Sequence, residues 1–244
     1  LKDLGLVGPP VISEQERRVL NNLEVVRAAE ILYALDERDY LASIYAELGE
    51  SADDIAGMAT LGEIAGKHND PRAMLLLGKG ALGRGLPLEY YAYPTSGLPN
   101  YTPIAPPVEP ALVYSIARQE SHFNQKVVSP ANAYGYMQVT PIAAKDTSKR
   151  FKAPYSRARL GSDPVYNMQM GAAELSMLLT TYNGSYLMTF AGYNAGRGRV
   201  RQWVAAYGDP RDPNVDPVDW AERIPLSETR NYLQRIMENL QVYR

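Results

Sequence analysis

The 244-residue sequence contains no cysteine, and its two histidines, His68 and His122, lie far apart in the chain. The absence of cysteine excludes disulfide bonds and thiolate metal sites. Neither histidine has further metal ligands at a suitable spacing, so we expect no metal site and no cofactor. No Ser/His/Asp set stands out, and the Gly-Arg-Gly step at 196–198 lacks the Lys-Ser/Thr of a phosphate-binding loop.

No stretch of about 20 apolar residues occurs, so we expect no membrane-spanning segment. Hydrophobic residues still make up 45% of the chain, enough for a sizeable core. The charges nearly balance, with 25 basic and 27 acidic residues, so no basic field attracts nucleic acid. The opening LKDLGLVGPP shows no signal peptide. Since the chain also begins without Met, we expect a processed or truncated form of something longer.

Helical patterns run through the chain, and no convincing alternating strand pattern interrupts them. Helices and short turns alternate over 13–85, which indicates stacked antiparallel pairs of a solenoid kind. Prolines and glycines over 86–109 indicate a Pro/Tyr-rich linker without regular helix. The sequence therefore predicts an all-α protein with an α-superhelical segment over 1–85, this linker, and an all-α domain over 110–244.

Local signals predict several helix ends. A capping box of Ser13 and Glu16 opens a helix that we expect to run to Leu35. Gly49 is expected to follow the end of the next helix as its C′ residue. Residues 152–163 are expected to be irregular. Prolines suited to the first position of a helix are Pro71, Pro110, Pro141 and Pro164.

Glu120 ends an apolar helical stretch. Val113, Ile116 and Ala117 share its apolar side, so the carboxyl is expected beside the core rather than in bulk water. Desolvation raises the pKa of a carboxyl and keeps its proton available near neutral pH. The residues alone leave two interpretations open, a catalytic acid or an ordinary helix-end glutamate in an ion pair, for example with Arg118.

Further polar groups stand at the ends of apolar helices in the same domain. Gln138 ends the run GYMQ, and Tyr193 and Asn194 lie in the run AGYNAG. Glu228 lies in the first turn of the last helix. Each has an ordinary interpretation as a turn amide, a capped helix or an acid near a helix N-terminus. Together with Glu120 they indicate a cleft, because helix ends in small all-α domains tend to border clefts.

The order of these runs resembles the catalytic domain of the soluble lytic murein transglycosylases. The matching runs are IARQES–HFN, S–P, A–YGYMQ, GYNAGRGRVRQW and RIPLSETRNYLQRI. The resemblance covers about residues 108–244 and implies a goose-type-lysozyme-like fold. The preceding segment resembles the end of the α-superhelix that comes before this domain in the family.

The resemblance also implies roles for individual residues. Glu120 matches the family's single catalytic acid/base. The residues expected to hold, polarise or orient the substrate are Ser121, Ser129, Gln138, Tyr193, Asn194 and Glu228. By resemblance, Glu120 protonates the oxygen between N-acetylmuramic acid and N-acetylglucosamine while the 2-acetamido group attacks the anomeric carbon. Glu120 then deprotonates the muramyl 6-hydroxyl, which closes a 1,6-anhydro ring.

The partners implied by the resemblance are peptidoglycan glycan strands and muropeptides, with no nucleic acid. We expect a periplasmic monomer in peripheral contact with the cell wall. Two alternatives stay open. One is a lysozyme- or chitinase-type hydrolase on the same fold, which needs a second carboxylate to activate water. The other is a non-catalytic glycan-binding scaffold.

Overall fold

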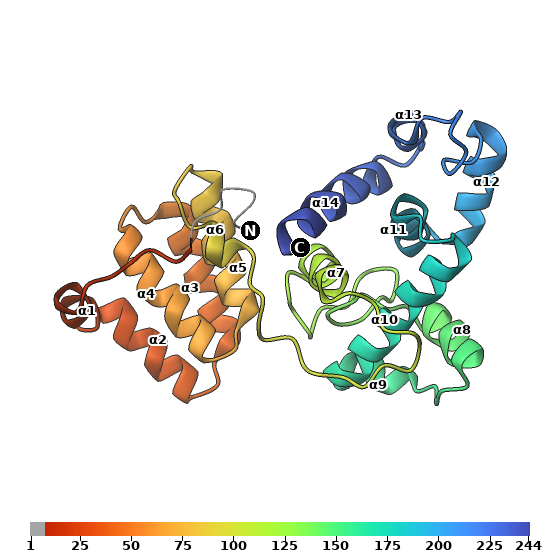
Figure 1. The fold of residues 1–244 in the computed structure, drawn as a ribbon. Coiled ribbons are helices and arrows are strands. Elements are labelled where there is room, and N and C mark those ends of the chain that lie inside the picture. Colours follow the sequence, from red (N-terminus) through yellow and green to blue (C-terminus); the bar gives the residue numbers. More distant parts are fainter. Residues whose placement is uncertain (1–7) are drawn as a thin grey trace. The chain divides into compact units, whose positions relative to one another are not determined.

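The computed structural model describes residues 8–244, which form helices joined by turns and loops (Figure 1). Within these residues the only strand-like pairing is two isolated bridges, from Tyr134 to Val128 and to Val139. The prediction of an all-α protein is confirmed. The signal-peptide prediction rests largely on residues 1–7, which lie outside the described residues.

The chain divides into two compact units, Leu1–Leu98 and Pro99–Arg244. In the first unit α3 packs against α5, and α4 packs against α2 and α5, around buried side chains such as Tyr45 and Leu77. The helices of this unit are α1 (Glu14–Leu20), α2 (Glu24–Ala34), α3 (Arg38–Ser51), α4 (Ile55–Lys67), α5 (Pro71–Gly83) and α6 (Glu89–Ala92).

The first helix is shorter than predicted. The capping box forms, because the Ser13 hydroxyl accepts a bond from the Glu16 backbone N–H and the Glu16 carboxylate accepts one from the Ser13 N–H. The helix does not run to Leu35, however, since two asparagines follow Leu20. The second of them, Asn22, donates its side-chain N–H to a backbone carbonyl at 2.7 Å. Asparagine competes with helical hydrogen bonding in this way and favours helix ends.

The prediction that Gly49 follows the end of its helix is wrong. Gly49 lies inside α3, which continues to Ser51. A Cβ at this position would lie 2.5 Å from the backbone oxygen of Leu77 on α5. Glycine is needed here because the backbones of α3 and α5 approach too closely to leave room for a side chain. The conformational freedom that glycine has in turns plays no part at this position.

The predicted linker contains the short helix α6, so the expectation of no helix over 86–109 is wrong at 89–92. Leu88 and Tyr91 are buried in the first unit. The Tyr91 hydroxyl donates to the backbone oxygen of Ala59 at 3.0 Å. Its ring fills the space beside Gly62, where a Cβ would lie 2.5 Å away. Burial of these side chains outweighs the helix-breaking residues around them.

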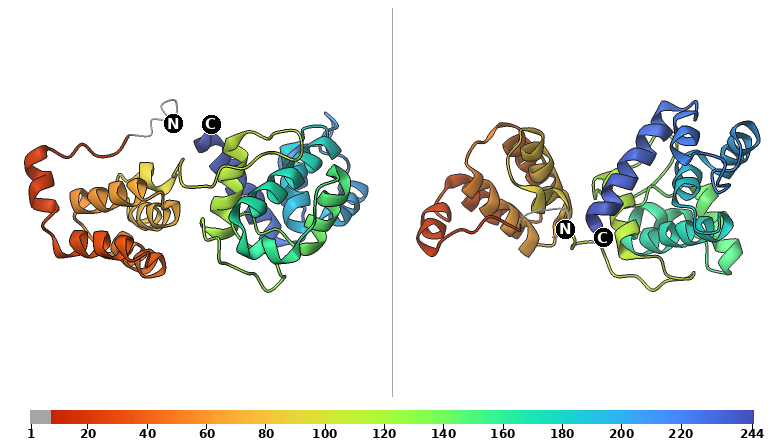
Figure 2. Two further views of the ribbon diagram at one scale, coloured as in Figure 1. Left: turned by 90° about the horizontal axis from the view of Figure 1, so that it is seen from below. Right: turned by 45° about the horizontal axis from the view of Figure 1, so that its top comes forward.

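The second unit is a bundle in which α7 packs against α14, while α10 packs against α8, α9 and α11 (Figure 2). The expectation of irregular structure over 152–163 is wrong for α9, whose first turn is capped by the Ser156 hydroxyl. No helix within residues 8–244 is long and apolar enough to cross a membrane. The helices of this unit are α7 (Pro110–Ser121), α8 (Pro141–Phe151), α9 (Arg157–Ser162), α10 (Pro164–Thr181), α11 (Tyr186–Ala195), α12 (Arg197–Tyr207), α13 (Pro217–Glu222) and α14 (Ser227–Tyr243).

Helix α7 ends abruptly behind Glu120. Two successive residues, His122 and Phe123, are left-handed with φ of 49° and 58°, which stops the helical hydrogen-bonding pattern. Neither is glycine, so both conformations carry a steric penalty that the surrounding structure must hold in place. Phe123 is buried, and its packing anchors the start of the loop 122–140.

One buried side chain on α10 fixes the far end of this loop. The Asn167 side-chain oxygen accepts a bond from the Met137 N–H at 3.0 Å. Its amide nitrogen donates to the backbone oxygens of Tyr134 at 2.7 Å and Leu160 at 3.0 Å. Gly135, with φ of 68°, lies against the same amide, where a Cβ would come within 2.7 Å. The loop that follows α7 is therefore held at a defined position on α10.

Candidate active site

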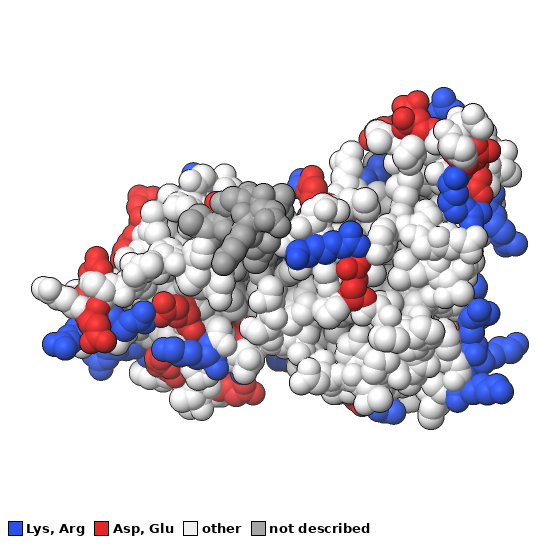
Figure 3. Space-filling model, viewed as in Figure 1, with Lys and Arg blue, Asp and Glu red and all other residues white. Residues whose placement is uncertain are grey.

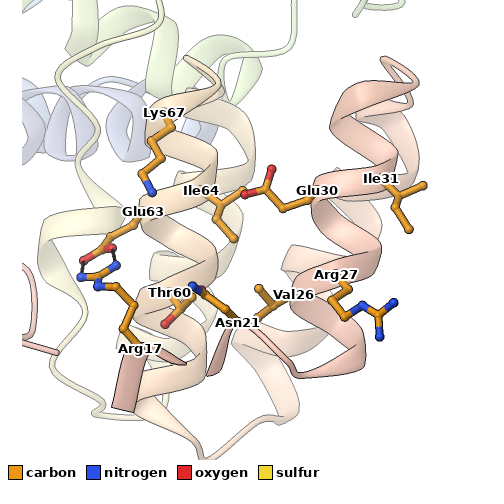
Figure 4. A pocket seen from close by; sticks show the side chains of 10 residues that line it. All are labelled: Arg17, Asn21, Val26, Arg27, Glu30, Ile31, Thr60, Glu63, Ile64 and Lys67. Carbon is orange, nitrogen blue, oxygen red and sulfur yellow. Dashed lines mark hydrogen bonds and ion pairs between the residues drawn. The ribbon is translucent and has the colours of Figure 1, made fainter. Parts of the chain in front are cut away.

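A hollow of about 400 Å³ lies in the first unit, lined by α1, α2, α4 and the turn after α1 (Figure 4). Its main polar feature is the Arg17 guanidinium, which bonds both oxygens of the Glu63 carboxylate. Figure 4 also shows that Arg27 and Ile31 extend away from this pair. This ion pair joins α1 to α4, and that structural role is sufficient to explain the polar groups that line the hollow.

A larger groove of about 1070 Å³ lies in the second unit, lined by α8, α10, α11 and α12. Of the predicted site residues, Tyr193 and Asn194 line it. Met177 and Leu178 on α10 supply apolar lining, and Glu174 on the same helix adds a carboxyl that sequence reasoning missed. The groove thus combines apolar faces with a few polar groups, as small-molecule and saccharide sites do.

Glu120 is half-buried in the last turn of α7. The Tyr232 hydroxyl on α14 donates to its Oε1 at 2.7 Å. Ile116 and Ala117 on the preceding turn are fully buried, as the apolar pattern predicted. Arg118, considered as an ion-pair partner, donates to the side-chain oxygen of Asn239 at 2.9 Å.

The surroundings of Glu120 raise the pKa of its carboxyl from the ordinary 4.5 to about 7. Burial is the largest cause, and the hydrogen bond from Tyr232 opposes it by stabilising the charged form. The negative charge of Glu228 adds a smaller upward contribution to the pKa. Both protonation states of Glu120 are therefore accessible at neutral pH, as general acid–base catalysis requires.

Glu174 is the second carboxyl with a strongly raised pKa in this unit. It is half-buried in the middle of α10, and burial followed by the charge of Glu120 raises its pKa to about 8. The signal that could have revealed it is simple, since Glu174 is the only acid in the apolar stretch 164–181. A lone acid in a buried helix is rare unless it has a partner or a function.

Ser121, Ser129 and Gln138 hold the loop 122–140 through its backbone. The Ser121 hydroxyl lies 2.9 Å from the backbone oxygen of Tyr136. The Ser129 hydroxyl oxygen accepts a backbone N–H of the loop at 3.1 Å. The Gln138 amide donates to two loop carbonyls at 3.0 and 3.3 Å. None of the three belongs to the lining of the groove, so their visible role is to shape the loop beside Glu120.

Tyr193 and Asn194 connect α11 to the rest of the site. The Tyr193 hydroxyl donates to the backbone oxygen of Met137 at 2.7 Å. Burial raises the pKa of Tyr193 well above its ordinary value, and the nearby carboxyls raise it further. The side-chain oxygen of Asn194 accepts the Thr229 hydroxyl at 2.7 Å. The two residues therefore join the loop 122–140 and α14 to the groove wall.

The start of α14 supplies one residue that sequence reasoning assigned to the site, Glu228, and one that it missed, Tyr232. Glu228 is exposed in the first turn, and its charge reaches Glu120. The helical period places Tyr232 on the apolar face of this helix, and nothing in the sequence marks it as a site residue. The residue is 5% exposed, and its hydroxyl is the hydrogen-bond donor to Glu120. Periodicity locates a tyrosine ring in the core without showing which acceptor its hydroxyl reaches.

Within residues 8–244 no group of three or more His, Cys, Asp or Glu side chains is arranged to hold a metal ion. The polar groups that the structure brings together here are the carboxyls of Glu120 and Glu174 and the hydroxyl and amide groups around them.

Residues 103–215 match the family described as Transglycosylase SLT domain. Over 131 residues the chain is 38% identical to the soluble lytic murein transglycosylase of Escherichia coli K12. Over 157 residues it is 31% identical to the membrane-bound lytic murein transglycosylase C of Cronobacter sakazakii. These alignments cover 53% and 56% of this chain but only 20% and 42% of the relatives. The chain therefore spans much less than the length of these proteins.

The crystal structure of the 70-kDa soluble lytic transglycosylase from Escherichia coli resembles this chain with a TM-score of 0.72 at 26% identity. The match covers 100% of this chain and 39% of that one. The complex of the 70-kDa soluble lytic transglycosylase with bulgecin A has the same TM-score. The predicted resemblance to the soluble lytic murein transglycosylases is confirmed in sequence and in fold.

Proposed function

Because residues 103–215 match the transglycosylase SLT domain, we propose that this chain carries the catalytic domain of a peptidoglycan lytic transglycosylase with Glu120 as its single acid/base. One observation supports this most directly. Glu120 is half-buried, its pKa is raised to about 7, and the Tyr232 hydroxyl bonds its carboxyl at 2.7 Å. Such a group can donate a proton and then take one back at the same pH.

In the first step Glu120 protonates the oxygen that links N-acetylmuramic acid to N-acetylglucosamine. The bond from this oxygen to the anomeric carbon breaks, and the carbonyl oxygen of the muramyl 2-acetamido group bonds to the anomeric carbon. The N-acetylglucosamine end leaves with the proton on its new hydroxyl. Ordinary retaining glycosidases need a second carboxylate as nucleophile, and here the substrate supplies that atom.

In the second step the Glu120 carboxylate removes the proton of the muramyl 6-hydroxyl. The 6-oxygen attacks the anomeric carbon and displaces the acetamido oxygen, which closes the 1,6-anhydro ring. Glu120 regains its proton, and no water is consumed. Between the steps the Tyr232 hydroxyl, 2.7 Å from Oε1, stabilises the transient carboxylate.

The proposed substrates are peptidoglycan glycan strands and muropeptides, which carry anionic stem peptides. Lys145 and Lys149 on α8 and Arg201 on α12 line the groove and suit such carboxylates. Figure 3 shows Lys and Arg side chains along the edge of this unit where Figure 1 places α8 and α12. We place the protein at the cell wall in the periplasm, acting as a monomer.

The test is digestion of purified peptidoglycan followed by mass spectrometry of the soluble products. Wild-type protein should release muropeptides that end in 1,6-anhydromuramic acid. Products with reducing muramic acid would instead identify a hydrolase, and the absence of soluble products would identify a glycan-binding scaffold.

Glu120→Gln should abolish lysis while the protein stays folded and binds glycan. Glu238→Gln is the matched control, because Glu238 lies on the same unit with 59% of its side chain exposed. Lysis by Glu120→Gln at the wild-type rate would show that another group is the acid.

A further inference from the structure

Glu174 occupies an unusual place for a carboxyl. It lies in the middle of α10 between the buried residues Ala173 and Leu175, is itself half-buried, and lines the groove. Within residues 8–244 its carboxyl forms no hydrogen bond and no ion pair. A carboxyl removed from water without a partner destabilises the fold. An apolar side chain at this position would stabilise the buried helix more than a carboxyl does, so the presence of the acid indicates a role in function.

The charged neighbours of Glu174 do not neutralise it. On α12, Arg197 is the cation whose charge reaches it, but the guanidinium is ion-paired with Asp146 on α8. On α7, Glu120 adds a negative charge, and on α11 the nearest titratable group is Tyr193. The other titratable groups around it are Tyr232 on α14 and the cations Lys145, Lys149 and Arg201 of the groove lining.

These surroundings favour the protonated form. Burial is the main reason that the pKa of Glu174 rises to about 8, and the charge of Glu120 acts in the same direction. At neutral pH the side chain is then a carboxylic acid with one O–H donor. Nothing in the described part of the protein accepts this hydrogen bond, and the group faces the groove.

We propose that Glu174 is a saccharide-binding residue whose carboxylic acid donates a hydrogen bond to an acetamido or hydroxyl oxygen of the glycan in the groove. This inference rests on the proposed function of the groove as a glycan site. Glu174 does not serve as a water-activating base, because a base must be ionised at the working pH. A neutral Glu174 also avoids adding a second like charge to that of Glu228 near the transient carboxylate of Glu120.

The first experiment compares Glu174→Gln and Glu174→Leu in kcat/KM for peptidoglycan lysis at pH 6. The amide of Gln keeps a weaker donor, so we expect a loss of about threefold. Leu removes the donor, and we expect a loss of about tenfold, mainly through KM, which is the size of one neutral hydrogen bond. Glu238→Gln is the control for loss of one exposed acid, and circular dichroism checks folding. A Leu variant within twofold of wild type would overturn the proposal, as would a Gln variant as impaired as Leu.

The second experiment is the pH profile of kcat/KM between pH 6 and pH 9. Glu120 must be protonated in both proteins, whereas loss of the Glu174 proton costs wild type a further factor of about ten that Glu174→Gln does not lose. The ratio of the wild-type to the Glu174→Gln value should therefore fall by about tenfold as pH rises through the pKa of Glu174, which is about 8. A purely structural role of Glu174 would leave this ratio constant with pH, and that result would overturn the proposal.

The third experiment separates this inference from the proposed function. Binding of tetra-N-acetylchitotetraose is measured by calorimetry in Glu120→Gln and in the double variant Glu120→Gln/Glu174→Leu, so that no turnover is needed. We expect about tenfold weaker binding by the double variant at pH 6. Equal affinities would refute the role of Glu174 even if the protein is lytic. Weaker binding by the double variant supports that role even if peptidoglycan digestion yields no anhydro products.

Discussion

Glu120→Gln is expected to stabilise the second unit, and to do so more strongly at high pH. The pKa of Glu120 is about 7 in the folded protein, against an ordinary value of 4.5. A raised folded-state pKa gives a stabilising contribution that is fully present below the unfolded pKa and is lost as pH rises through the folded pKa. Wild-type protein therefore loses stability between about pH 4.5 and pH 7. The glutamine variant does not, because an amide does not titrate.

The two pKa values determine the size of this effect. Relative to a permanently neutral side chain, wild-type Glu120 reduces the free energy of unfolding by about 0.8 kcal/mol at pH 5 and about 3.3 kcal/mol at pH 8. The advantage of Glu120→Gln should thus grow by about 2.5 kcal/mol between these pH values. The glutamine oxygen can still accept the bond that Tyr232 donates at 2.7 Å. Glu174 titrates in both proteins, so most of its contribution cancels in the difference.

Urea unfolding followed by tryptophan fluorescence is the assay. The two tryptophans, Trp203 and Trp220, both lie in the second unit, so the signal reports the unit that contains Glu120. Glu238→Gln removes one exposed acid and should show no such growth with pH. An advantage of Glu120→Gln that is equal at pH 5 and pH 8, or a loss of stability at pH 8, would contradict the conclusion that Glu120 is held away from water.

Two further predictions concern the groups that hold Glu120 and its loop. Tyr232→Phe keeps the buried ring but removes the hydrogen bond that lowers the pKa of Glu120. The alkaline limb of the pH profile of kcat/KM should therefore move up by about 1 pH unit. An unchanged limb would mean that the hydrogen bond does not form. Asn167→Leu removes three hydrogen bonds to backbone groups and should lower the free energy of unfolding by about 3 kcal/mol in the same urea assay, with loss of lysis. The control is Gln169→Leu, two residues further along α10, which removes one exposed hydrogen bond and should lower the free energy of unfolding by less than about 1 kcal/mol. Equal effects of the two variants would refute the anchoring role of Asn167.

Helix starts were predictable because their signals are local. Pro71, Pro110, Pro141 and Pro164 each open a helix, as expected. Gly49 was misjudged because its role depends on α5, a helix that lies close in space but not in sequence. The rule for glycine at helix ends is correct in general, and here the close approach of two helices overrides it.

The candidate site was predictable only in part for the same reason. The apolar side of α7 located Glu120, because residues one turn apart share a face. Its hydrogen-bond partner Tyr232 lies 112 positions away, and the helical period assigns that residue to the core. Glu174 lies in a stretch whose apolar pattern predicts an ordinary buried helix. Long-range packing, which periodicity does not encode, brings these three residues into one site.

The abrupt end of α7 has a consequence for the proton cycle of Glu120. The peptide dipoles of a helix sum to about half a negative charge at its C-terminus, and the effect is confined to the last turn. His122 and Phe123 stop the helix directly after Ser121, so the Glu120 side chain extends from that last turn. The negative pole opposes ionisation of the acid, and it makes the carboxylate, once formed, a stronger base. Because His122 and Phe123 end the helix at this point, the same helix dipole favours the protonated form of Glu120 before proton donation and raises the basicity of its carboxylate afterwards.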